Sequence, residues 1–178
     1  QPGAGRRQPP ARPQVQAGQT WQTHHDLHRL PAFRPFIEIV ETAAAAVMAQ
    51  LKVASSGLVV TGCWANVNAP GLPHGSHNHP NNYLSGVYYV QTGPGADMIT
   101  FLDPRPQVLQ ILPRFTQVTP QNAQELNVPA PEGRLLFFPG WAGHAVPANR
   151  SNQERISISF NLMFRDYGRT VARPGWKG

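Results

Sequence analysis

Residues 74–90, HGSHNHPNNYLSGVYYV, combine three closely spaced histidines with a run that is typical of a buried strand. His77 and His79 are two residues apart, so in an extended segment both imidazoles leave the same face of the chain. Two imidazoles can chelate one ion of Fe, Zn, Cu or Ni, but a complete site needs at least one further ligand. The best candidate is His144, which follows a strand-like segment and a glycine-containing turn in FFPGWAGHAVPAN.

Around this stretch the sequence predicts one helix followed by strands. Apolar residues recur at helical spacing over residues 34–52, which predicts an amphipathic helix. After Gly57, short β-type runs are separated by Pro, Gly and Asn; they are 58–69, 83–91, 97–102, 107–112, 114–118, 134–139 and 155–164. The segment between Pro113 and Pro131 is polar and loop-like. The pattern predicts a mainly β fold, a jelly roll or barrel with the helix packed on one face.

The net charge of +6 lies at the two ends of the chain. Residues 1–20 carry three arginines and no acid, residues 165–178 carry four basic residues against Asp166, and residues 21–164 carry eight basic and eight acidic residues. We therefore expect a disordered basic arm over 1–20, one domain over 21–168 with its β part at 57–164, and a basic tail over 169–178. A neutral body disfavours a nucleic-acid groove, which leaves only weak anion contact through the basic ends.

The sequence also bears on location. No apolar run approaches the roughly 18 residues of a membrane span, so we expect no membrane partner. Cys63 is the single cysteine, which excludes an internal disulfide and agrees with a reducing, cytoplasmic compartment. The first residues lack the apolar core of a secretory signal. Because the chain begins with Gln rather than Met, the question whether a leader was removed stays open. The oligomeric state is also open, a homodimer included.

The last predicted strand has one polar and one apolar face. Arg155, Ser157, Ser159 and Asn161 alternate with apolar residues in RISISFN. One interpretation is a strand half exposed to solvent. The other places the polar face inside the mouth of a barrel, where a guanidinium and a neighbouring hydroxyl form a bidentate receptor for a carboxylate.

Four segments in order, HNHPNNYLSGVYYV, ITFLDPR, GRLLFFPGWAGHAVPAN and ERISISFN, resemble a family of small, mostly bacterial 2-oxoglutarate- and Fe(II)-dependent oxygenases. The resemblance covers about residues 57–164 and implies a double-stranded β-helix fold, with Fe(II) and 2-oxoglutarate as cofactors and O2 as co-substrate. It implies hydroxylation of an unidentified small molecule or peptide. By the family's motif, His77 and His144 bind the metal, and His79 stands at the position of the third ligand. The resemblance assigns binding of 2-oxoglutarate to Arg155 and Ser157, and Tyr89 is a further candidate for the same role.

The chain departs from the family at His79, where an Asp or Glu is usual. An all-histidine triad carries no ligand charge, so the metal should hold anionic co-ligands more strongly. Zn is the competing ion, but closed structural zinc sites are rich in Cys, which favours an open catalytic site here. The substitution leaves open whether His79 is a ligand and whether 2-oxoglutarate still drives the chemistry.

Other polar and aromatic residues near the motifs are candidates for the pocket: His74, Asn82, Tyr83, Ser85, Asp103, Trp141 and Asn161. Strand alternation puts His79, Tyr83, Ser85 and Tyr89 on one side if no bulge intervenes. His74 is off this alternation, so we expect it at the pocket rim or in solvent. Asp103 could supply a missing carboxylate, although Asp-Pro at a strand end is typical of a turn. His24 and His28 are interpreted as surface residues rather than metal ligands.

Two rival functions remain at this point. A cupin-like dioxygenase with a three-histidine metal would need no co-substrate, and Arg155 argues against it. A binding protein with a jelly-roll fold and a vestigial metal site would recognise a sugar or anion, docking on a polyanion through the basic ends of the chain.

Overall fold

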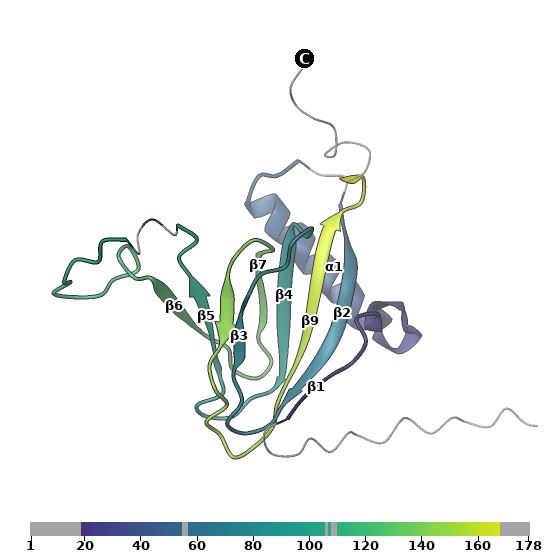
Figure 1. Ribbon diagram of the computed structural model, residues 1–178. Helices are drawn as coiled ribbons and strands as arrows, with labels where there is room; N and C mark the ends of the chain where they lie inside the picture. The colour runs from purple at the N-terminus through teal and green to yellow at the C-terminus, as the bar shows by residue number, and fades with distance from the viewer. Residues whose placement is uncertain (1–18, 55–56, 106, 108–109, 168–178) are drawn as a thin grey trace, which may run out of the picture.

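The computed structural model describes residues 19–54, 57–105, 107 and 110–167, which form two antiparallel sheets and one long helix (Figure 1). The predicted arm and tail lie outside the described residues, except for Gln19 and Thr20. The elements are β1 (Thr20–Gln22), η1 (Leu27–Arg29), η2 (Pro31–Phe33), α1 (Arg34–Gln50), β2 (Leu58–Asn68), β3 (His74–His77), β4 (Leu84–Gln91), β5 (Met98–Leu102), β6 (Glu125–Pro129), β7 (Leu135–Pro139), β8 (His144–Val146) and β9 (Arg155–Phe164).

The larger sheet has the strand order β1-β2-β9-β4-β7. Its centre is β9, which pairs with β2 from Leu58↔Phe164 to Asn68↔Arg155, with one irregularity between Val60 and Gly62. On its other side β9 pairs with β4. Because side chains alternate across a strand, β9 sends one set of residues toward the helix and the other toward the smaller sheet.

The smaller sheet has the order β3-β8-β5-β6. Its inner strand β8 pairs with β3 through His77↔His144 and with β5 through Phe101↔His144. Val87, Tyr89, Ile99, Ala130 and Phe138 form a buried apolar cluster that joins β4 and β7 of the larger sheet to β5 of the smaller one. The two-sheet, mainly β architecture confirms the predicted fold class.

Helix α1 covers the larger sheet on the face away from the smaller one (Figure 1). Its buried residues, Val40, Ala44 and Met48, are four apart and form one apolar stripe. The stripe packs on a cluster that includes Phe160 and Leu162 of β9. The predicted helix over 34–52 is confirmed, ending two residues early at Gln50. No helix among the described residues has the length and apolar character needed to cross a membrane.

Five of the seven predicted strands are confirmed to within two residues; they correspond to β2, β4, β5, β7 and β9. The strands predicted at 107–112 and 114–118 are wrong, because the described residues there form turns and bends on an excursion between β5 and β6. The apolar side chains that the structure describes there are exposed, Ile111 at 84%, because they have no sheet to pack against. The same excursion ends in β6, which lies in a segment that the sequence predicts to be a polar loop, and its residues are mostly exposed.

Gly86 of β4 tests the packing of β4 against Phe160 of β9, on the face of the larger sheet that the helix covers. A Cβ at this position would meet the ring of Phe160 and, at 2.6 Å, the backbone oxygen of Leu136. We predict that Gly86→Ala lowers the free energy of unfolding by about 1–3 kcal/mol, the usual cost of overpacking. Urea unfolding measures it, with Gly75→Ala as the control because a Cβ there meets nothing within 4 Å. Equal stability of the two variants would contradict the packing described.

Candidate metal and co-substrate site

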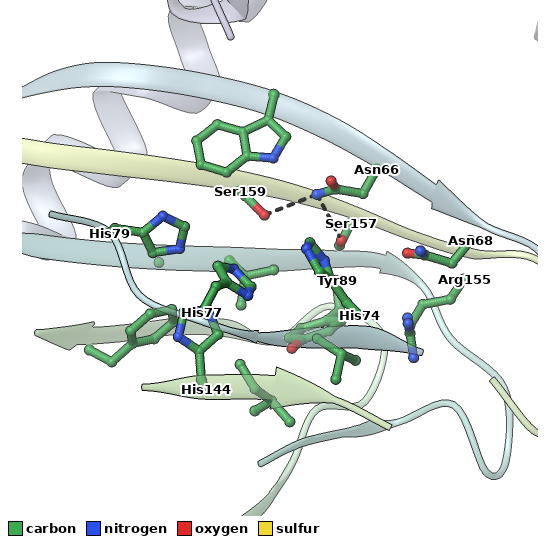
Figure 2. A pocket seen from close by; sticks show the side chains of 16 residues that line it. Asn66, Asn68, His74, His77, His79, Tyr89, His144, Arg155, Ser157 and Ser159 are labelled. Atoms are coloured by element: carbon green, nitrogen blue, oxygen red, sulfur yellow. Dashed lines mark hydrogen bonds between the residues drawn. The ribbon is translucent and has the colours of Figure 1, made fainter. Parts of the chain in front are cut away.

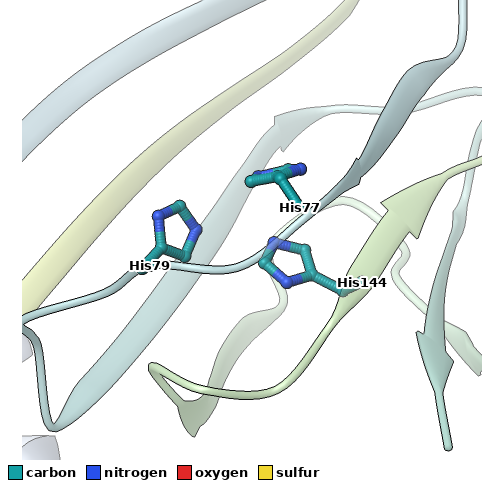
Figure 3. Close-up of side chains that lie close together, drawn as sticks. All are labelled: His77, His79 and His144. Carbon is teal, nitrogen blue, oxygen red and sulfur yellow. The ribbon is translucent and has the colours of Figure 1, made fainter. Parts of the chain in front are cut away.

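His77, His79 and His144 place one ring nitrogen each within 4.8 Å of one another, close enough to hold a single metal ion (Figure 3). His77 and His144 face each other across β3 and β8, with ring centroids 4.3 Å apart. The ring of His79 lies 5.1 Å from that of His77 and 5.2 Å from that of His144. Among the residues that the structure describes, this is the one group of this kind.

His79 is positioned by a turn rather than by the strand. The strand β3 ends at His77, so the expected extended pair on one strand is only partly present. The His79 backbone N–H donates to the Gly140 oxygen at 2.8 Å, and the Gly140 N–H donates to the Tyr83 oxygen at 3.0 Å. A Cβ at Gly140 would collide with the Asn82 oxygen, so a glycine is needed where these two segments meet.

Backbone carbonyls orient two of the three imidazoles. Nδ1 of His77 lies 2.8 Å from the Gly75 oxygen, and Nδ1 of His144 lies 2.9 Å from the Ala142 oxygen. A carbonyl only accepts, so in both rings Nδ1 carries the proton and donates it. The lone pair is therefore on Nε2, which is the arrangement that metal-binding histidines use.

Burial keeps the site in the form that binds a metal. Desolvation lowers the pKa of His144. Desolvation, with a smaller contribution from the neighbouring histidines, lowers the pKa of His79 to about 4. Neutral imidazole is the ligand form, so both rings are ready to coordinate at neutral pH.

The three histidines line one end of a cavity between the sheets (Figure 2). Strands β2 and β9 contribute three cross-strand pairs that face this cavity: Trp64↔Ser159, Asn66↔Ser157 and Asn68↔Arg155. Tyr89, Val87, Ile99 and Phe138 form much of the remaining wall. Arg155 and His79 lie at opposite ends (Figure 2). The polar face of the last strand therefore points inward, as one of the two interpretations of the sequence had it.

Arg155 is a buried cation with an unsatisfied donor. Its exposure is 2%, Nη1 donates to the Pro147 oxygen at 3.1 Å, and Nη2 is buried without a hydrogen-bond partner. Such a group is costly unless an acceptor, preferably an anion, occupies the cavity beside it. Tyr89 lines the same cavity, and burial raises its pKa to about 12, so its phenol stays protonated.

His74, expected at the pocket rim or in solvent, lines the cavity. Its ring stacks on His77 with centroids 4.5 Å apart and an angle of 18° between planes. The register of β3 on β8 shifts between His74 and His77, which explains why residues three apart in a strand reach the same cavity.

The structure does not bring the other six expected pocket residues to the cavity wall. Tyr83 packs on Phe164, and Asn82 accepts a hydrogen bond from Thr61. Ser85 donates to Asn161 at 2.8 Å within the sheet, and Trp141 is 63% exposed. Alternation therefore fails at Tyr83, because the turn at 80–83 precedes β4, whereas Ser85 shares the face of Tyr89 without reaching the cavity wall.

Asp103 supplies no carboxylate to the cavity. Both of its oxygens accept hydrogen bonds from the Arg105 side chain, at 3.0 and 2.7 Å, and these bonds lower its pKa to about 2. The turn interpretation of Asp-Pro agrees with this geometry. His24 is exposed and His28 is partly buried, and neither belongs to the metal-binding group.

Asn66 and Asn68 of β2 were not among the residues expected in the pocket. Trp64, Asn66 and Asn68 all line the cavity, and they alternate in CWANVN. That alternation was the available signal, since polar residues at every second position of a buried strand indicate a polar cavity. Gln22 Nε2 donates to Asn66 Oδ1 at 2.7 Å, so the Asn66 amide donates to Ser159 at 3.0 Å and to Ser157 at 3.5 Å.

Comparison with known protein families matches residues 62–161, more than half of the chain, to the family described as "Putative 2OG-Fe(II) oxygenase". The chain belongs to this oxygenase family. The cofactors named by the family are Fe(II) and 2-oxoglutarate, which agrees with the resemblance seen in the sequence. A search of curated proteins gave no significant match.

Solved structures of oxygenases share the fold. The carbocyclase SnoK from nogalamycin biosynthesis matches with a TM-score of 0.59 and 14% identity, over 93% of this chain and 78% of SnoK. The epimerase SnoN from the same biosynthesis matches with a TM-score of 0.58 and 17% identity, over 88% of this chain and 68% of SnoN. A Pseudomonas putida prolyl-4-hydroxylase matches with a TM-score of 0.54 and 16% identity, over 82% of this chain and 72% of the hydroxylase. The chain spans 44% of the Burkholderia pseudomallei 2OG-Fe(II) oxygenase that it matches. At these identities the likeness shows the fold.

The residues of the cavity fit an iron ion and 2-oxoglutarate. Three imidazoles form a nitrogen set suited to iron, and a three-ligand set leaves positions open on the metal. The free Nη2 of Arg155 is a donor without an acceptor in the same cavity, which suits the far carboxylate of a dicarboxylate.

We predict that His77→Ala or His144→Ala abolishes iron binding, because each removes a ligand from a different strand. Metal analysis after anaerobic loading measures it. His24→Ala is the matched control, since this exposed histidine is outside the cluster and should leave the iron content unchanged. Full occupancy in either cluster variant would contradict the site.

For His79 the ligand hypothesis gives a separate prediction. His79→Asp should retain iron, because aspartate can coordinate from the same position. If His79 does not bind the metal and only orients the residues that do, His79→Ala should weaken iron binding by no more than about 10–100-fold. Iron titrations of the two variants separate these cases; loss of iron from His79→Asp would contradict the ligand assignment.

Proposed function

We propose that the chain is an oxygenase that hydroxylates its substrate, with iron on His77, His79 and His144 and 2-oxoglutarate on Arg155. The observation that carries the proposal is the buried Nη2 of Arg155, which has no partner and lines the same cavity as the three histidines. A metal site alone would need no such cation.

The charge of Arg155 supports a carboxylate as its partner. A guanidinium can donate two parallel hydrogen bonds to one carboxylate, each with a net value of about 1.5–3 kcal/mol. Nη1 is already held by the Pro147 oxygen, which fixes the direction of the group. Ser157, two residues along β9, accepts from Asn66, so its own hydroxyl proton is free for a ligand oxygen.

The remaining wall supports chemistry that needs water excluded. Val87, Ile99 and Phe138 present apolar side chains to the cavity, and all three are buried. When bound, Fe(II) and 2-oxoglutarate would supply the activation of O2, coupled to decarboxylation of the co-substrate to succinate. The protein's part is to hold the metal in one geometry, to orient the dicarboxylate and to keep the cavity dry.

We propose hydroxylation because it requires fewer protein groups than the other reactions of this fold. The structural relatives are named as a hydroxylase, an epimerase and a carbocyclase, so the fold alone does not choose. Hydroxylation needs only a substrate C–H bond directed at the metal, without a second hydrogen donor. The substrate is a small molecule or a peptide. The free, buried thiol of Cys63 supports a cytoplasmic location.

We predict that Arg155→Ala lowers the affinity for 2-oxoglutarate by at least about 100-fold and leaves iron content nearly unchanged. The variant loses the charged donor, whereas the three histidines stay in place. Anaerobic titration of 2-oxoglutarate into the Fe(II) protein measures the affinity through the metal-to-ligand charge-transfer absorption, and succinate release reports turnover.

Two variants act as controls. Arg155→Lys should recover only part of the affinity, because an ammonium cannot make the two-pronged contact. Arg150→Ala should bind like the wild type, since this exposed arginine lies outside the metal cavity. If the wild type shows no charge-transfer band, the assignment fails, and a co-substrate-free or binding-only function replaces it.

A further inference from the structure

The metal cavity has no acidic side chain. Of its lining residues, four are histidines, one is Arg155, and none of those that the structure describes is Asp or Glu. Asp103, the carboxylate that the sequence offered as a candidate, is held by Arg105. The wall of the cavity, as far as the structure describes it, therefore carries no negative charge to balance a bound cation.

The charge of the loaded site can be counted from these residues. A divalent iron and the Arg155 guanidinium contribute three positive charges, and 2-oxoglutarate contributes two negative charges. With an aspartate ligand the sum would be zero, but with His79 one positive charge remains. An uncompensated charge in a buried cavity is costly, so an anion is favoured there.

The end of the cavity away from Arg155 has a donor for such an anion. Ser159 lies four residues from Arg155 on β9, about 13 Å along the strand. Its oxygen accepts a hydrogen bond from Asn66, whose amide is oriented by Gln22. The Ser159 hydroxyl proton is thereby free to point into the cavity.

The neighbours of Ser159 place it on the His79 side of the site. Its cross-strand partner is Trp64, whose ring centroid lies 5.9 Å from that of His79. Ser159 is also separate from the Arg155 end, where Ser157 and Tyr89 serve the proposed co-substrate (Figure 2). The cavity thus has a donor at each end: Nη2 of Arg155, which is buried without a partner, and the hydroxyl of Ser159, whose oxygen already accepts from Asn66.

We propose that the cavity binds a second anion, a monoanion at Ser159 beside Trp64 and His79, in addition to 2-oxoglutarate. The anion is either a carboxylate of the substrate or an inorganic ion such as chloride. This inference rests on the proposed function, because the charge count includes iron and 2-oxoglutarate.

The test compares a charged probe with its neutral counterpart. Acetate, acetamide and chloride are titrated separately into the anaerobic Fe(II) protein saturated with 2-oxoglutarate, and the shift of the charge-transfer band is followed. Acetate should bind at least about tenfold more tightly than acetamide, because only acetate offsets the excess charge. A response to acetate alone indicates a substrate carboxylate, and a response to chloride as well indicates an inorganic anion.

A matched pair of variants locates the anion. Ser159→Asp places a fixed carboxylate at the proposed position and should weaken acetate binding at least tenfold relative to Ser159→Asn, which has the same shape without the charge. His79→Asp, checked for iron content, should weaken it likewise. If the Ser159 variants do not fold, the comparison of acetate with acetamide in the wild type decides alone.

The outcomes separate this inference from the proposed function. Absence of the charge-transfer band in the wild type refutes the proposed function. A normal band with equal affinities for acetate and acetamide, or loss of the band because acetate displaces 2-oxoglutarate, refutes only the second anion. Equal acetate affinities in Ser159→Asp and Ser159→Asn also refute it.

Discussion

The pairing of His77 with His144 across β3 and β8 is the constraint on which the candidate site depends. Strand β3 is at the edge of its sheet and has β8 as its one neighbour among the described strands. The Nδ1 bonds to Gly75 and Ala142 turn both rings toward the same point. His79 joins them through its backbone bond to Gly140, in the turn that precedes β8. A metal held by all three would join two segments 65 or more residues apart in the sequence, which couples metal binding to the stability of this edge.

Strand β9 contributes side chains both to the core and to the candidate site. Phe160 and Leu162 pack under the helix, whereas Arg155, Ser157 and Ser159 face the cavity. Cross-strand neighbours on β2 complete the polar face, and Gln22 of β1 fixes the direction of the Asn66 amide. The cavity is consequently rich in donors and lacks acids, so its charge balance depends on what it binds. This difference from the usual carboxylate-containing triad is the most specific feature of the chain.

The sequence predicted the fold class, the helix and five strands, because long periodic segments carry strong signals, as 155–164 and 34–52 do. It also identified the three histidines and Arg155, which the structure brings to one cavity. It missed β3 and β8, whose three or four residues are too few to show a period. It placed Tyr83 in the pocket because the turn at 80–83 is invisible to alternation, and it placed Ser85 there because alternation gives the face of a strand but not where the cavity ends. The segments 107–112 and 114–118 have the composition of strands. Whether such a segment pairs with a neighbouring strand is decided by the tertiary structure, and the described residues of these two do not pair.

A crystal structure of the protein prepared anaerobically with Fe(II) and 2-oxoglutarate tests the central claim most directly. The account predicts one iron peak in the anomalous map, bonded to Nε2 of His77, His79 and His144, with the far carboxylate of 2-oxoglutarate on Nη2 of Arg155. Iron bonded elsewhere, or 2-oxoglutarate bound without contact to Arg155, would contradict it.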